Sequence, residues 1–180
     1  KEKRTVELVW TTGARVRRFD WFTEEEFFEE LSLDPQHVRM DRLNKGAPLL
    51  DTHGRWRLAD VIGVVEDATV DGKEGRATVR FSERAEVQPI FDDVAAGIIR
   101  NVSVGYRINK IEKIRENGVL VVRVIDWEPQ ELSLVPIGAD AGAGVRSAEK
   151  DRVFPCEVID NTIPPADPAT QRKEPSMTPE

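Results

Sequence analysis

Residues 101–110 read NVSVGYRINK, and this stretch decides the fold class because its hydrophobicity alternates with a period of two. Apolar side chains at every second position are typical of a half-buried β-strand. Here they are Val102, Val104, Tyr106 and Ile108. Ser103 and Gly105 then share the polar face. Because glycine lacks a side chain, the serine is open to close approach by another backbone or by a substrate.

The flanks of this strand predict a helix before it and a hairpin after it. Apolar residues recur at spacings of three and four over 87–98, with Pro89 in the first turn, as in an amphipathic helix. After the strand, Asn117-Gly118 is a hairpin turn signal, and residues 119–127 are long enough to pair back along it. Pro129 is expected to interrupt this strand, and residues 130–135 to form a separate one.

The N-terminal half also predicts mostly strands. We expect strands at 5–10, 14–19, 38–40, 61–70 and 77–81, the last two joined by the turn at 71–75. Thr23 and Glu26 have the spacing of a capping box, which predicts a short acidic helix leading into Phe27, Phe28 and Leu31. The sequence therefore predicts an α+β, mostly β protein of about seven strands and two clear helices.

Length and composition narrow the class of protein. A chain of 180 residues suits one domain, expected at residues 1–150, followed by a proline-rich and mostly disordered linker or tail at 151–180. The net charge of −7 argues against a nucleic-acid partner. No apolar run is long enough to span a membrane. With Cys156 the only cysteine and two histidines, no disulfide, metal site or cofactor is expected.

Three polar residues suggest a catalytic site. A serine becomes a nucleophile when a base takes its proton, and that base is commonly a histidine oriented by a carboxylate. Ser103, His53 and Glu131 can fill these roles, since His53 ends an extended segment and Glu131 lies on one face of a predicted strand. The residues alone leave His37 open as the base, and Asp51 or Asp140 as the orienting carboxylate.

Three blocks of the sequence resemble a known family. Residues 49–53 (LLDTH), 101–106 (NVSVGY) and 129–136 (PQELSLVP) are similar, in order and rough spacing, to the signature blocks of the prohead proteases of tailed bacteriophages, the HK97 type. The resemblance spans about residues 5–145. It departs from the family where Gly54 follows the histidine, a position at which many members carry an acidic residue, and at 110–115, which has no counterpart.

The resemblance implies a fold, a function and partners. The fold is a small antiparallel β-barrel with a few surrounding helices, similar to herpesvirus assemblin. The function is a serine endopeptidase with His53 as general base, Ser103 as nucleophile and Glu131 as the third member. Its substrates would be the phage capsid precursor and scaffolding protein, and the protease itself, inside the assembling procapsid in the bacterial host cytoplasm. A homo-oligomer and a fusion to a longer polyprotein are left open.

Two alternatives follow from the same residues. The first is a non-catalytic, β-rich capsid-associated interaction module, in which the three polar residues are merely surface residues. The second is a serine hydrolase of small esters, although the G-x-S-x-G nucleophile elbow of the α/β hydrolases is absent around Ser103.

Overall fold

The computed structural model describes residues 4–145, which form a mostly β structure with short helices. The tail predicted at 151–180 and Cys156 lie outside the described residues. The strands are β1 (Thr5–Thr11), β2 (Val16–Asp20), β3 (Glu25–Leu31), β4 (Pro48–Asp51), β5 (Val61–Val70), β6 (Gly75–Phe81), β7 (Val102–Glu116), β8 (Val119–Leu134) and β9 (Gly144–Val145). The helices are α1 (Asp41–Asn44), η1 (Leu58–Asp60), η2 (Ala85–Val87) and α2 (Gln88–Ala95).

The long strand β8 organises the sheet. On one side it pairs antiparallel with β7 along its whole length. On its other side it pairs in parallel with β3 near its start, through residues 120–124, and with β4 near its end, through residues 132–134. The sheet continues from β4 through β5, β6 and β1 to β9. One strand therefore belongs to two groups of strands.

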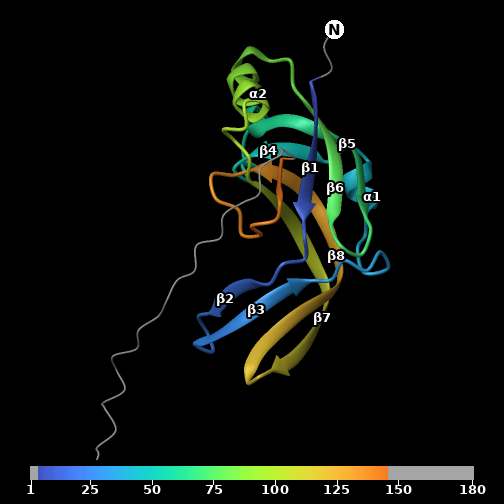
Figure 1. The fold of residues 1–180 in the computed structure, drawn as a ribbon, viewed down its shortest axis with the longest axis vertical. Coiled ribbons are helices and arrows are strands. Elements are labelled where there is room, and N and C mark those ends of the chain that lie inside the picture. The colour runs from blue at the N-terminus through green and yellow to red at the C-terminus, as the bar shows by residue number, and fades with distance from the viewer. Residues whose placement is uncertain (1–3, 146–180) are drawn as a thin grey trace, which may run out of the picture.

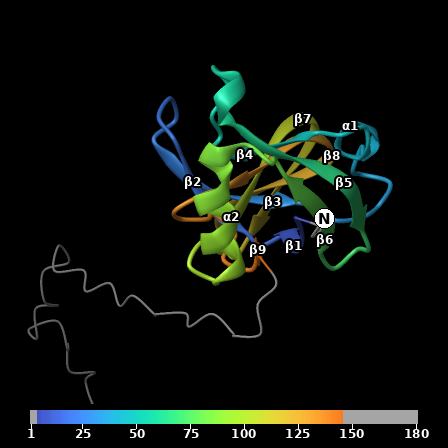
Figure 2. The ribbon, with the colours of Figure 1, turned by 90° about the horizontal axis from the view of Figure 1, so that it is seen from above.

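These two groups form two lobes (Figure 1). The arm consists of β2, β3 and the hairpin residues 106–127 of β7 and β8. The body consists of β1, β4, β5, β6, β9 and the remaining parts of β7 and β8, with α2 beside it (Figures 1 and 2). The arm is thus an extension of the same sheet.

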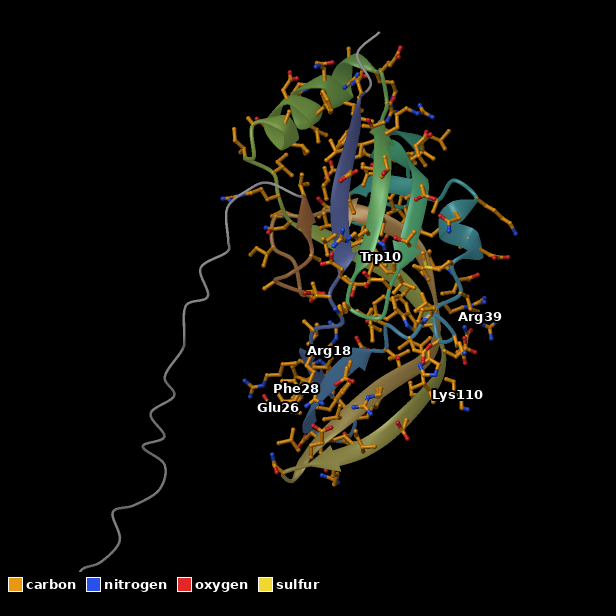
Figure 3. The ribbon with its side chains drawn as sticks, turned by 45° about the vertical axis from the view of Figure 1, so that its right-hand side comes forward. Trp10, Arg18, Glu26, Phe28, Arg39 and Lys110 are labelled. Carbon is orange, nitrogen blue, oxygen red and sulfur yellow. The ribbon has the colours of Figure 1, made fainter. Side chains whose placement is uncertain are left out.

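Buried aromatic rings pack where the arm joins the body. Trp10 and Trp127 are fully buried and meet edge to face at 5.9 Å between ring centroids, and Tyr106 meets Trp127 at 5.7 Å. The indole N–H of Trp127 donates to the carbonyl of Ser32 at 2.9 Å. A β-carbon at Gly75 would lie 2.4 Å from the Trp10 ring, so glycine is required there. Trp10 lies at this junction in Figure 3.

The prediction of a small antiparallel β-barrel is wrong. The sheet is unclosed, and two of its pairings, β3 with β8 and β4 with β8, are parallel. The two-residue β9 forms a ladder with β1 but meets the start of β7 only through the isolated bridge between Asn101 and Gly144. A strand this short is too limited to join two edges by a full ladder. The mostly β composition is as predicted.

The predicted acidic helix over residues 23–31 is also wrong, because this segment forms strand β3. The Asp20 side chain accepts a hydrogen bond from the Phe22 N–H at 2.9 Å, which helps to shape a turn between β2 and β3. Arginines of β2 and the loop before it then pair with glutamates of β3. These pairs are Arg15 with Glu30, Arg17 with Glu26, and Arg18 with Glu29. Cross-strand charge pairs and the ladder to β8 outweigh the local capping signal. Arg18, Glu26 and Phe28 are labelled on the arm in Figure 3.

Other boundaries differ for local reasons. Pro129 does not interrupt β8, because it lies beside a register shift opposite Tyr106 and between the residues that pair with β3 and those that pair with β4. The strand expected at 38–40 is reduced to one bridge between Val38 and Trp127. The strands expected at 61–70 and 77–81 and the helix after residue 87 are confirmed. Within residues 4–145, no helix is long and apolar enough to cross a membrane.

Candidate functional site

His53 lies in a strained turn that directly follows β4. The Gly54 N–H donates to the carbonyl of Asp51 at 2.8 Å, and the two residues between them, Thr52 and His53, have φ values of 50° and 57°. Positive φ at both central positions is typical of a type I′ turn, which normally uses glycine or asparagine. Threonine and histidine are neither, and holding a non-glycine residue at positive φ costs about 1–3 kcal/mol for each residue. The surrounding structure must therefore hold the turn in place.

Strand β8 provides that support. The Thr52 N–H donates to the carbonyl of Leu134 at 2.9 Å, and the His53 N–H donates to the hydroxyl of Ser133 at 3.2 Å. Ser133 is fully buried. The turn is thus fixed to the end of β8 by one backbone and one side-chain acceptor.

Glu131 connects this turn to the interior. Its carboxylate is 3% exposed, Oε1 lies 2.7 Å from His53 Nδ1, and Oε2 accepts the Ser133 hydroxyl at 2.6 Å. An ionised carboxylate only accepts hydrogen bonds, so this contact assigns a proton to Nδ1 and leaves Nε2 of a neutral ring as the free acceptor. Both oxygens of a buried charge are satisfied, as burial requires.

Gly105 makes room for this carboxylate. Gly105 is opposite Glu131 in the β7–β8 ladder, and a β-carbon on it would lie 2.1 Å from Glu131 Oε1 and 2.8 Å from Glu131 Cδ. No side chain fits at that distance. The sequence predicted that the missing side chain of Gly105 leaves Ser103 open to another backbone or a substrate, whereas in the structure the space over Gly105 is filled by a carboxylate of the same chain.

Ser103 occupies the same face two residues earlier. It pairs with Ser133 in the β7–β8 ladder and is half-buried. It lines a cavity of about 60 Å³ between arm and body, together with Trp10 and Tyr106. Within residues 4–145 its hydroxyl makes no hydrogen bond. The structure therefore brings His53 and Glu131 into contact and places Ser103 nearby through strand register alone. The catalytic roles of the three residues stay a prediction.

The alternative residues are engaged elsewhere. His37 Nδ1 lies 2.8 Å from the Ser32 hydroxyl, and Asp51 accepts the Thr52 hydroxyl at 2.7 Å. Asp140 accepts the Thr12 N–H at 2.6 Å and the Thr12 hydroxyl at 2.8 Å, which ties its loop to the end of β1.

Sequence reasoning missed Ser133 as a partner of this cluster. The signal was present, because Ser133 lies two residues after Glu131 in a strand and so shares its face. In the described part of the chain, no group of three or more histidine, cysteine, aspartate or glutamate side chains could hold a metal ion.

Comparison with known proteins gives one informative match. The chain is 44% identical over 111 residues to the major capsid protein of Halomonas phage phiHAP-1. The match covers 60% of this chain but only 18% of that protein's length. No protein-family model matches the chain, and no solved structure matches it significantly.

This match overturns the expectation of a serine endopeptidase. The relative is named as a capsid protein, a structural component of the particle, and none of the comparisons points to a protease or another enzyme. The phage-capsid part of the expectation agrees with the relative's name. Cleavage of a scaffolding protein has no support from the match.

Proposed function

We propose that this chain is a non-catalytic, β-rich module that associates with the capsid protein of a phage during particle assembly in the bacterial host. The observation that carries the proposal is its 44% identity to part of a phage major capsid protein. Because the match covers less than a fifth of that relative, the proposal concerns a module and not a whole capsid subunit.

The tip of the arm supports a role in protein contacts. Trp21 and Phe22, in the turn between β2 and β3, are 83% and 99% exposed, and Phe19 meets Trp21 edge to face at 4.8 Å. Contact between clustered aromatic rings and water is energetically unfavourable, and such clusters commonly mark interaction surfaces. An arm with an aromatic tip is suited to reach a neighbouring protein.

In this proposal the cluster of His53, Glu131 and Ser133 has a structural role. A satisfied buried polar network restricts the conformations of the groups around it. Here it fixes the strained turn after β4 to β8, and so positions the loop that leads into β5. No proton transfer is required of it.

Co-assembly tests the proposal. We would express this chain with the part of the phiHAP-1 major capsid protein outside the matched region, separate assembled particles on a sucrose gradient, and follow the chain by immunoblotting. The chain should migrate with the particles, and alone should stay at the top of the gradient. A Trp21→Ser, Phe22→Ser variant should migrate with particles less than wild type does. Particles that form in its presence but contain none of the wild-type chain would contradict the proposal.

A further inference from the structure

A cleft beside the strained turn combines positive charge with exposed apolar surface. It has a volume of about 410 Å³ and lies between the end of α1, the start of β4, the loop of residues 54–60 and β8. Its walls include Arg42, Arg55, Trp56, Leu58 and Gln130. In Figure 2 the segment between β4 and β5, coloured teal, stands out from the sheet.

Two arginines of this cleft differ from most others in the protein. Arginines elsewhere form ion pairs with carboxylates, for example Arg39 with Asp126 and Arg80 with Glu66. Within residues 4–145, the side chains of Arg42 and Arg55 form no hydrogen bond or ion pair. An unpaired guanidinium presents several donors in a plane, a geometry that matches a carboxylate.

The loop of residues 54–60 exposes the apolar side chains of the cleft. Trp56 is 96% exposed and Leu58 is 89% exposed. The Arg57 side chain and N–H both bond to Asp60, and Arg84 donates to the carbonyls of Leu58 and Ala59 at 3.4 and 3.3 Å. These bonds fix the loop backbone and leave both apolar side chains facing outward. Such preorganisation lowers the entropic cost of binding.

We propose that this cleft binds an extended segment of a partner protein in which carboxylates flank an apolar side chain. Arg42 and Arg55 would hold the carboxylates, and Trp56 and Leu58 would cover the apolar side chain. Glu131 lies at the floor of the cleft, but both of its oxygens are already bonded. The inference rests on the proposed function, because it assigns a class of partner segment to the module.

Fluorescence anisotropy tests the inference with a fluorescein-labelled peptide of sequence GEELEFEEG. Charge-assisted hydrogen bonds predict that Arg42→Gln and Arg55→Gln each weaken binding about tenfold. Trp56→Ala should weaken it by a similar factor, because exposed aromatic anchors dominate binding. A peptide with glutamine in place of every glutamate should bind at least tenfold more weakly.

Lys73→Gln is the matched control, since it also removes one positive charge. Lys73 lies in the turn after β5, whereas the cleft lies at the start of that strand, so this variant should bind like wild type. Thermal unfolding of each variant establishes that it is folded. Equal binding of the two peptides, equal loss in Lys73→Gln, or no binding at millimolar peptide would overturn the inference.

Co-assembly separates this inference from the proposed function. If wild type migrates with particles while the peptide does not bind, the cleft assignment is wrong and the proposed function stands. If the peptide binds as expected while the chain stays off the particles, the proposed function is wrong and the cleft assignment stands.

Discussion

Replacing Gly105 by alanine should break the network that holds the His53 turn. The new β-carbon would lie 2.1 Å from Glu131 Oε1, far inside van der Waals contact, so the carboxylate must move. It would then lose its contact with His53, and its bond from Ser133 would be strained. A hydrogen bond to a charged group contributes about 1.5–3 kcal/mol. Alanine in place of glycine in a strand gains about 0.5–1 kcal/mol. The net loss in the free energy of unfolding should therefore be about 1–2 kcal/mol, and more if both bonds break.

A double-mutant cycle isolates the cause of this loss. We would measure urea unfolding of wild type, Gly105→Ala, Glu131→Ala and the double variant. Once Glu131 is truncated, the β-carbon meets no carboxylate, so Gly105→Ala should be neutral or slightly stabilising in that background. Gly138→Ala is a comparison with a milder contact, because the nearest atom to its new β-carbon is the Val102 carbonyl oxygen at 3.3 Å, which needs to shift by only a few tenths of an ångström. If Gly105→Ala destabilises the protein equally with and without the Glu131 carboxylate, the steric argument is refuted.

Three further predictions concern the rest of the structure. Burial and a neighbouring carboxylate raise the pKa of Tyr106 to about 12, so its contribution to the free energy of unfolding is present below pH 10 and is lost between pH 10 and 12. Absorbance titration of this tyrosine, the only one in the sequence, should show the late ionisation, and Tyr106→Phe should lose less stability than wild type over that pH range. Asp140→Ala removes the acceptor for the Thr12 N–H and hydroxyl and should lower the free energy of unfolding by about 1.5–3 kcal/mol; a change below about 0.5 kcal/mol in urea unfolding would refute this. Burial would raise the pKa of Glu30, but hydrogen bonds from Arg123 and a second arginine outweigh it and hold this pKa below its usual value. The associated stability is present above the unfolded-state pKa and is lost as pH falls through the lower folded-state pKa, so Arg123→Gln should lose less stability than wild type between pH 6 and pH 3.

Local patterns predicted much of the secondary structure. The hairpin of β5 and β6 and the strands of the long β7–β8 hairpin follow from alternating hydrophobicity and turn residues, which act over a few positions. The segment 25–31 was misassigned because it pairs not only with the neighbouring β2 but also with β8, which lies about ninety residues further along the chain. Its capping signal was local, whereas the ladder to β8 is not. The open sheet likewise depends on β9, which is too short to show a periodic pattern.

The candidate site shows the same division. Polarity and strand position made His53 and Glu131 candidates beside His37, Asp51 and Asp140, and the family resemblance singled out the pair that the structure places in contact. The type I′ turn at Thr52 and His53 was not predictable, because neither residue type favours positive φ and the turn depends on acceptors in β8. Geometry, moreover, does not determine function: a histidine bonded to a buried carboxylate serves structural and catalytic roles equally well.

The most direct test of the central claim is the reactivity of Ser103. We would incubate the wild-type chain with a fluorophosphonate, a reagent that labels activated serine hydroxyls, and measure the intact mass. A non-catalytic module should gain no mass, and neither Ser103→Ala nor His53→Ala should change that result. A single adduct on Ser103 that disappears in both variants would contradict the account and would show that the polar cluster activates a nucleophile.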